Sequence, residues 1–359
     1  SRWLIANPNA DLTTSVDNVA NRNVRSASID ASPDQINALL AGPITHVPLL
    51  DAQKRIVAVA TPTADALHIG RHRVSAEDPT LVIAEIGNNH QGSVSFAKEL
   101  VDLAADAGAD VVKFQLRDMD ALYRQSGGES AGEDLGAQYT LNLLAKFSLD
   151  AEQMFEVFDH CRKRDVDVLC TPWDTPSVRA LQEYGIPALK VASADMTNHA
   201  LLREMFATGL PLIVSTGMST EAEIRQSAEL LRSSGSPWAM LHCQSTYPAP
   251  FKDINLRYLK RLAEITGGPV GYSGHERGFH IPVAAVAMGA RIIEKHFTTD
   301  RTLEGNDHKV SLLPEEFGQM VERIRELEEA LGDGEARVVS TGESMNRVNL
   351  AKSLVAARL

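Results

Sequence analysis

The sequence predicts a closed (β/α)8 TIM barrel that carries a small N-terminal α+β appendage. From residue 81 onward, short apolar runs rich in β-branched residues alternate with amphipathic helices. Strands that are buried on both faces and separated by helices form parallel sheets. A doubly wound open sheet is the alternative, but it does not need eight strands, and no GxGxxG follows the first run. The eight runs are residues 81–87, 110–115, 167–171, 187–193, 211–216, 238–243, 269–273 and 290–297.

The predicted helices have recognisable ends. Thr220 and Glu223 form a capping box, and Gly235 is a typical helix terminator. A charged amphipathic helix is expected near 314–331. The connection over residues 116–150 is too long for an ordinary strand-to-helix loop, and its length predicts a functional lid.

The first 79 residues do not share the barrel pattern. Ser32 followed by Pro33 is typical of a helix start. The apolar runs 46–50 and 55–60 predict a β-hairpin. This stretch weakly resembles half of a CBS regulatory module, although a plain hairpin is the favoured interpretation. With 61–79 taken as a linker, we divide the chain into an N-terminal extension (1–79) and a barrel with a C-terminal tail (80–359).

Composition narrows the class of partner. The chain has 35 Lys and Arg against 47 Asp and Glu, for a net charge of −12. Such a surface repels phosphates, so we expect neither a nucleic-acid nor a membrane partner. A small anionic substrate remains compatible, because a pocket can be locally basic. The 3 cysteines have no ligand spacing, and no apolar run has the roughly 18 residues of a membrane span. We therefore expect a soluble cytoplasmic protein.

Polar side chains gather at the carboxyl ends of the predicted strands, where such barrels place their active sites. Lys113 and Lys190 lie within buried runs, which is unfavourable unless each is paired. Lysines with hydroxyls form a cradle for phosphate or carboxylate. The alternative is that each lysine reaches past the rim into water. The other strand-end residues are Glu85, Gln115, Thr171, Ser193, Ser215, His242, Ser273, His275, Glu294 and His296.

Two histidines end neighbouring predicted strands. His275 and His296 can share one divalent cation, with Glu85 and Asp307 expected nearby. Either histidine alone would be interpreted as a hydrogen-bonded rim residue. Nitrogen and oxygen ligands suit Mn, Zn or Mg almost equally. Cys243 is interpreted as a buried strand-end thiol, because a nucleophilic cysteine needs a base in an electropositive niche.

Eight motifs in order carry a family resemblance: AEIGNNHQGS, VVKFQ, TPWD, LKVASAD, IVSTGMS, LHCQSTYPAP, GYSGHERG and EKHFT. Together they resemble the sialic acid synthase family over residues 80–359. Members of that family condense phosphoenolpyruvate with an N-acetylmannosamine-type sugar, or its 6-phosphate, to a nonulosonic acid. The resemblance implies a transferase of carbohydrate biosynthesis, in which a metal activates the sugar aldehyde and phosphate leaves by C–O cleavage.

The resemblance also implies a role for each matching residue. The metal ligands are His275 and His296, with Mn as the expected cation and Mg, Co or Zn as alternatives. The acid–base groups are Glu85 and Asp195. The phosphoenolpyruvate cradle consists of Lys113, Thr171, Lys190, Ser193, Ser215 and Ser273, and the sugar contacts are Gln115, Ser245, Tyr247 and Asp307.

Several positions depart from the family pattern. Asp195 stands where members often have Glu, Ser245 where many have Asn, and Trp173 where many have Phe. Gly274 stands where some members have Asp. Members usually continue into an antifreeze-like domain that lends an arginine to the neighbouring subunit's sugar site. This sequence ends at Leu359, so we expect the catalytic barrel without that domain, and a homodimer is a possible assembly.

Two alternatives stay open. A related phosphoenolpyruvate-dependent 3-deoxy keto-acid synthase would share the cradle and differ at Gln115, Tyr247 and Asp307. A non-catalytic ligand-binding barrel with a regulatory N-terminal segment is the other. The presence of both histidines, both lysines and Glu85 argues against the second alternative, because a binding-only barrel has no use for a metal site.

Overall fold

The computed structural model describes residues 25–32, 35, 36, 39, 47–60, 67–122, 141–332 and 334–351. The chain divides into two compact units, Ser1–Asp65 and Ala66–Leu359. In the first unit, β1 (Ala27–Ser28), β2 (Val47–Leu50) and β3 (Ile56–Ala60) form one sheet. β1 is parallel to β2, and β2 is antiparallel to β3. Among the described residues of this unit, Val47 and Leu49 form the buried hydrophobic cluster.

The helix that was expected after Ser32 is described only in part. The Ser32 hydroxyl accepts a hydrogen bond from the Gln35 backbone N–H at 3.3 Å, and the Gln35 side chain accepts one from the Ser32 N–H at 3.0 Å. Ile36 and Leu39 pack against the two core residues of β2. Most other positions of this helix lie outside the described residues.

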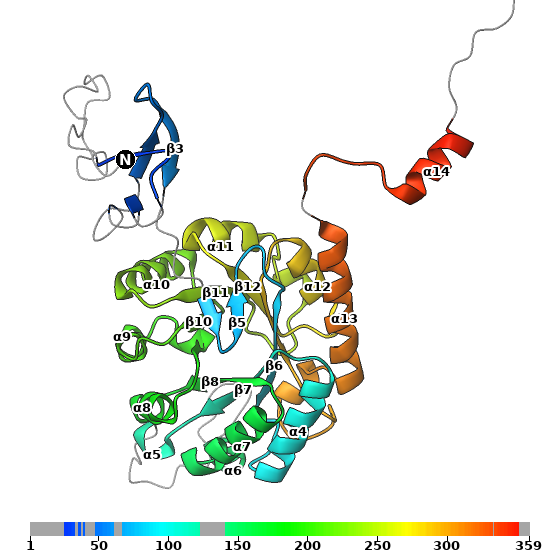
Figure 1. Ribbon diagram of the computed structural model, residues 1–359. Coiled ribbons are helices and arrows are strands. Elements are labelled where there is room, and N and C mark those ends of the chain that lie inside the picture. The colour runs from blue at the N-terminus through cyan, green and yellow to red at the C-terminus, as the bar shows by residue number, and fades with distance from the viewer. Residues whose placement is uncertain are drawn as a thin grey trace, which may run out of the picture. The chain divides into compact units, whose positions relative to one another are not determined.

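The second unit is a closed barrel of parallel strands, which confirms the predicted fold (Figure 1). β6 pairs with both β7 and β13, so the first and last strands close the sheet. The order around the barrel is β6-β7-β8-β9-β10-β11-β12-β13. The strands are β6 (Leu81–Gly87), β7 (Val111–Leu116), β8 (Asp167–Pro172), β9 (Leu189–Val191), β10 (Leu212–Ser215), β11 (Trp238–Cys243), β12 (Val270–Gly274) and β13 (Ile292–His296).

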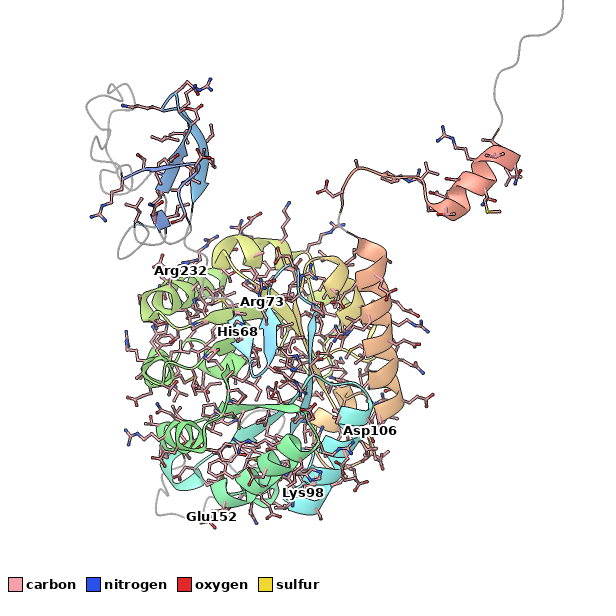
Figure 2. All side chains as sticks on the ribbon, in the orientation of Figure 1. His68, Arg73, Lys98, Asp106, Glu152 and Arg232 are labelled. Atoms are coloured by element: carbon pink, nitrogen blue, oxygen red, sulfur yellow. The ribbon has the colours of Figure 1, made fainter. Side chains whose placement is uncertain are left out.

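Helices surround the barrel and keep charge on its outside. Asp106, Glu152 and Arg232 are exposed and lie at the periphery of the molecule (Figure 2). The apolar faces of the helices pack on the outer face of the strands. The helices around the barrel are α4 (Val94–Asp106), α5 (Met119–Leu122), α6 (Leu141–Phe147), α7 (Ala151–Lys163), α8 (Thr175–Tyr184), α9 (His199–Ala207), α10 (Glu221–Ser234), α11 (Tyr258–Thr266), α12 (His280–Ala287) and α13 (Pro314–Leu331). A further helix, α14 (Thr341–Leu350), has no buried residue.

The helix ends follow the local sequence. Thr220 and Glu223 form the expected capping box of α10, and Gly235 ends this helix with a φ of 77°. The last barrel helix, α13, has the bounds expected for it. Of the connection 116–150 that was expected to be a lid, the structure describes α5 and α6, while 123–140 lie outside the described residues. None of the described helices is long and apolar enough to cross a membrane.

A second hairpin closes the amino-terminal end of the barrel. It is formed by β4 (Leu67–Ile69) and β5 (His72–Val74), within the segment that we interpreted as a linker. Leu67, Ile69 and Val74 are buried in one cluster with inward-facing barrel residues. The Arg71 backbone N–H donates to Asp167 Oδ2 at 3.0 Å and ties the turn to β8. The hairpin therefore belongs to the barrel unit, because its apolar side chains fill the floor.

We predict that shortening one floor residue destabilises the barrel. Ile69 is fully buried, and an Ile69→Ala change should lower the free energy of unfolding by about 2–5 kcal/mol, through lost burial and the cavity left behind. Urea denaturation followed by circular dichroism measures the loss. Ile69→Val is the matched control and should cost only about 0.5–1.5 kcal/mol. Equal stability of Ile69→Ala and the parent chain would show that the hairpin is not part of the floor.

Candidate active site

The inward-facing side chains form successive layers along the barrel axis. A lower layer is apolar and includes Ile83, Val111 and Ile292. Because side chains alternate along a strand, the residues two positions further also point inward. Those positions hold polar groups on most strands. The second layer is Glu85, Lys113, Thr171, Lys190, Ser215, Cys243, Ser273 and Glu294.

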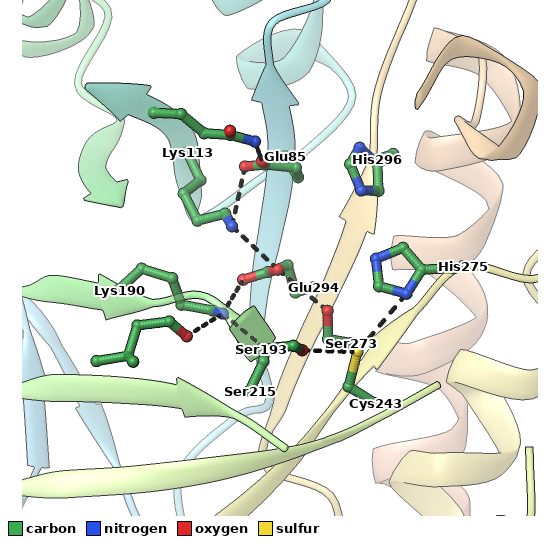
Figure 3. A network of polar contacts seen from close by, with 12 residues as sticks. Glu85, Lys113, Lys190, Ser193, Ser215, Cys243, Ser273, His275, Glu294 and His296 are labelled. Atoms are coloured by element: carbon green, nitrogen blue, oxygen red, sulfur yellow. Dashed lines mark hydrogen bonds and ion pairs between the residues drawn. The ribbon is translucent and has the colours of Figure 1, made fainter. Parts of the chain in front are cut away.

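An ion network occupies this second layer (Figure 3). Lys113 Nζ lies 3.2 Å from Glu85 Oε2 and 3.1 Å from Glu294 Oε1. Lys190 Nζ lies 3.9 Å from Glu294 Oε2 and donates to Ser215 Oγ at 2.6 Å. The Lys113 and Lys190 residues are only 5% and 1% exposed, so the alternative in which they reach into water is wrong. Glu294 is the carboxylate that links the two lysines.

The two lysines have opposite pKa shifts. Burial would lower the pKa of Lys113, but the Glu294 and Glu85 carboxylates outweigh burial and raise it above the usual value. Burial lowers the pKa of Lys190 to about 8, since Glu294 only partly offsets it. Lys113 is therefore a permanent cation, and Lys190 is a cation that titrates near neutral pH.

The two glutamates also differ. Burial raises the pKa of Glu85 to about 7, with Lys113 opposing that rise. For Glu294, Lys113 and Lys190 together outweigh burial and lower the pKa below its usual value. Glu85 can therefore exchange a proton near neutral pH, whereas Glu294 stays ionised as the counter-charge of the lysines.

Gln115 connects the ion network to the rim of the mouth. Its Nε2 donates to Glu85 Oε1 at 2.8 Å. Its Oε1 accepts from Arg117 Nη2 at 2.6 Å and from Trp173 Nε1 at 3.2 Å. The Arg117 guanidinium stacks 4.4 Å from the centroid of Trp173. A side chain at Gly87 would collide with Glu85 and Gln115, so glycine is needed there for this contact to form.

The two histidines lie together in the mouth. Their ring centroids are 5.3 Å apart, and the Tyr247 ring lies 4.2 Å from that of His275. His296 Nδ1 is 4.0 Å from Asp307 Oδ2, which belongs to the turn η3 (Asp307–Val310). The structure thus brings together the expected metal ligands and two of the expected sugar contacts.

The donor set of this pair fits a divalent cation. His296 Nδ1 is buried without a hydrogen-bond partner among the described residues, and burial holds its pKa well below the usual range. A neutral imidazole with a free lone pair is what a metal ligand requires. His275 Nδ1 lies 3.0 Å from the Gln244 carbonyl oxygen, which leaves Nε2 as the ligand atom. Across the described ranges there is no group of three or more His, Cys, Asp or Glu that could hold a metal, so further ligands would come from water or substrate.

Cys243 is buried, as interpreted from the sequence, but it has a basic neighbour that the sequence did not indicate. Its Sγ lies 3.6 Å from His275 Nδ1 and 3.6 Å from Ser245 Oγ. The Ser193 hydroxyl donates to the same sulfur at 3.5 Å. Burial would raise the thiol pKa, yet His275 and the Ser193 and Ser245 hydroxyls together outweigh burial and lower it to about 7. Ser193 and Ser245 thus lie beside the histidine side of the mouth.

Three residues that the sequence analysis singled out lie apart from these contacts. Thr171 is buried on β8, level with Gln115 in the strand register. Asp195 belongs to the turn η1 (Ser193–Asp195), where its Oδ1 accepts from Asn198 Nδ2 at 3.0 Å and burial raises its pKa. His242 faces away from the mouth, since its Nε2 donates to the Ile254 carbonyl oxygen at 2.6 Å.

Glu294 is the functional residue to which the sequence analysis gave no role. It was read only as a strand-end residue of the mouth. Two lysines buried within strand runs demand a buried counter-charge, and Glu294 lies two residues before His296, on the same face of the same strand. These two features of the sequence could have indicated Glu294 as the buried counter-charge of the lysines.

The fold and the mouth define a TIM-barrel enzyme, because the charged layer and the paired imidazoles lie at the carboxyl ends of the strands. Among solved structures, the chain is similar to the N-acetylneuraminic acid (sialic acid) synthetase of Leptospira borgpetersenii, crystallised with citrate. That match has a TM-score of 0.71 and 32% identity, and it covers 81% of this chain and 99% of the other.

The sequence comparisons identify the family. The profile of the NeuB family matches residues 100–336. The chain is 38% identical over 285 residues to the N,N'-diacetyllegionaminic acid synthase of Campylobacter jejuni, covering 78% of this chain and 85% of that protein. It is 34% identical over 316 residues to the N-acetylneuraminate-9-phosphate synthase of Drosophila melanogaster, covering 78% and 82%. The chain belongs to the NeuB family.

We predict that removing the Lys113 ammonium destabilises the barrel in a pH-dependent way. Lys113→Met leaves the Glu85 and Glu294 carboxylates without their shared partner and should cost about 3–5 kcal/mol at pH 7. The pKa of Glu85, already raised, then rises further, and the pKa of Glu294 rises as well, so the penalty acts above the unfolded pKa and shrinks as pH falls. Urea denaturation at pH 7 and pH 5 measures both effects. An equal loss at the two pH values would contradict this account of the network.

Proposed function

We propose that the chain condenses phosphoenolpyruvate with an N-acetylmannosamine-type sugar, or its 6-phosphate, to a nonulosonic acid, and releases phosphate. The observation that carries the proposal is the pair of buried lysines within a ring of hydroxyls at the barrel mouth. Membership of the NeuB family supports it, as do relatives that are synthases of diacetyllegionaminic acid and of N-acetylneuraminate 9-phosphate.

In this proposal the cationic side of the mouth binds phosphoenolpyruvate. Lys190 provides the available positive charge, because Lys113 is already compensated by two carboxylates. Ser215 accepts a hydrogen bond from Lys190, and we propose it as one of four hydroxyls that donate to the phosphate and carboxylate oxygens of the substrate. These are Thr171, Ser193, Ser215 and Ser273.

The histidine side receives the sugar aldehyde. His275 and His296 would hold a divalent cation, for which we propose Mn²⁺. When bound, the cation supplies Lewis-acid polarisation of the aldehyde carbonyl. Ser245, Tyr247 and Asp307 lie near the histidines, and we propose that they orient the sugar together with Gln115.

The reaction forms a C–C bond and a C2–O bond from water, and it breaks the C2–O bond to phosphate, with the second water proton leaving on phosphate as the C2 carbonyl forms. The alkene carbon C3 of phosphoenolpyruvate attacks the aldehyde carbon, and the aldehyde oxygen takes up a proton. Water adds to the electron-poor C2, and phosphate departs with the bridging oxygen. Glu85, with a pKa of about 7, can supply the proton to the sugar oxygen and remove one from water. Asp195 is the second acid–base candidate.

The activity belongs to the unit that starts at Ala66, since the floor hairpin lies within that unit. For the first unit, Ser1–Asp65, we propose no part in the chemistry, because the described residues of the mouth belong to the second unit. We further propose that the enzyme acts in the cytoplasm and as a homodimer.

The experiment that tests the function is phosphate release from phosphoenolpyruvate by the purified chain with Mn²⁺. We expect release only when N-acetylmannosamine or its 6-phosphate is present, and we expect a chelator to stop it. The sugar that supports release identifies the phosphorylation state of the substrate. Release that is independent of sugar, or no release with either sugar, would contradict the proposal.

We predict a pH dependence of phosphoenolpyruvate binding that comes from Lys190. Its ammonium is present below pH 8 and is lost as pH rises through about 8, so the KM for phosphoenolpyruvate should rise toward about tenfold per pH unit above that value. Lys190→Arg keeps the charge at every accessible pH and should flatten the profile. Initial rates between pH 6.5 and 9.5 provide the measurement. The same rise in Lys190→Arg would assign the titration to another group.

A further inference from the structure

A fully buried ion pair joins the two segments that carry the histidines. Glu276 directly follows His275, and Lys295 directly precedes His296. Lys295 Nζ lies 3.1 Å from Glu276 Oε1, with both side chains 0% exposed. The same ammonium donates to the Glu276 backbone carbonyl oxygen. Because neighbouring residues of a strand point to opposite faces, Lys295 points away from the mouth into which His296 points.

A tyrosine completes this network from β12. The Tyr272 hydroxyl donates to Glu276 Oε2 at 2.6 Å, and the ring is buried. Each carboxylate oxygen of Glu276 therefore has its own partner. Oε1 contacts Lys295 on β13, and Oε2 contacts Tyr272 on β12. The segment after β12 is thereby held to both of the neighbouring strands that carry the mouth.

The space for this carboxylate is provided by Gly274. A Cβ atom at residue 274 would lie 2.7 Å from Glu276 Oε1, 2.8 Å from Tyr272 Cε1 and 2.9 Å from Glu276 Oε2. Any side chain at this position would therefore displace Glu276 and the Tyr272 ring. Gly274 does not have a positive φ, so its conformation is open to other residues, and it is the contact between Glu276 and Tyr272 that requires a glycine.

We propose that Tyr272, Glu276 and Lys295 are positioning residues that fix His275 and His296 relative to each other for a shared divalent cation. This inference rests on the proposed function, which assigns the cation to these two histidines. A buried ion pair is a weak source of net stability, since desolvation offsets much of the attraction. Its consequence here is geometric: it ties together the backbone on either side of the two imidazoles.

The test measures Mn²⁺ binding to the full chain by isothermal titration calorimetry, without substrate. Tyr272→Phe removes one hydroxyl, and Glu276→Gln with Lys295→Met removes both charges together, so that no buried charge is left uncompensated. Partners that orient metal ligands typically contribute about 10–100-fold in affinity, and we expect a loss in that range for the double variant, with a smaller loss for Tyr272→Phe.

A control separates positioning from general loosening of the fold. Leu231→Ala in α10 deletes a buried side chain outside the network and should lower stability by about 2–5 kcal/mol. We expect it to bind Mn²⁺ as the parent does. If Leu231→Ala loses affinity as the network variants do, at matched stability in urea, then general destabilisation explains the effect and the inference is wrong.

A conservative substitution tests the carboxylate itself. Glu276→Ala should weaken Mn²⁺ binding, and Glu276→Asp, which keeps a carboxylate at residue 276, should weaken it less. Folded network variants that bind Mn²⁺ with the parent affinity would overturn the inference and leave the proposed function intact. A parent chain that binds no Mn²⁺ would instead overturn the metal site of the proposed function, and the inference with it.

Discussion

Charge compensation inside a closed barrel is the constraint on which the mouth depends. Two lysines and two glutamates lie in one buried layer of the closed sheet. Burying any one of these charges alone would cost several kcal/mol, so each residue depends on the others. The compensation is uneven. Lys113 lies within 3.2 Å of two carboxylates, whereas Lys190 has one carboxylate at 3.9 Å and a serine hydroxyl.

That unevenness supports the proposed anion site in a protein that is acidic overall. A cation already held by two carboxylates attracts a phosphate weakly, while a cation with one distant carboxylate attracts it strongly. Burial lowers the pKa of Lys190, and Glu294 offsets that shift only in part. In the proposed function, a bound phosphate or carboxylate would supply the further negative charge.

The layers of the barrel interior place the two halves of the proposed site at fixed spacing. Ser273 lies in β12, and His275, two residues further, directly follows that strand. Glu294 and His296 are two residues apart on β13. The cradle and the imidazoles are therefore successive inward positions of the same chain segments. Below them, an apolar layer and the hairpin β4–β5 fill the floor. Gly87 and Gly274 supply space where a polar side chain from a neighbouring position must fit.

The amino-acid sequence by itself determined the barrel, the α10 capping box, the bounds of α13 and the strand ends at which polar residues gather. These features are local, because they depend on the period of apolar residues and on caps within one turn. The roles of the individual site residues in catalysis and binding stay predictions. Only the tertiary structure decided that Glu294 links the two lysines, that 67–74 form a floor rather than a linker, and that Glu276 pairs with Lys295. Each of these contacts joins segments distant in sequence, and the register of the closed sheet alone brings them together.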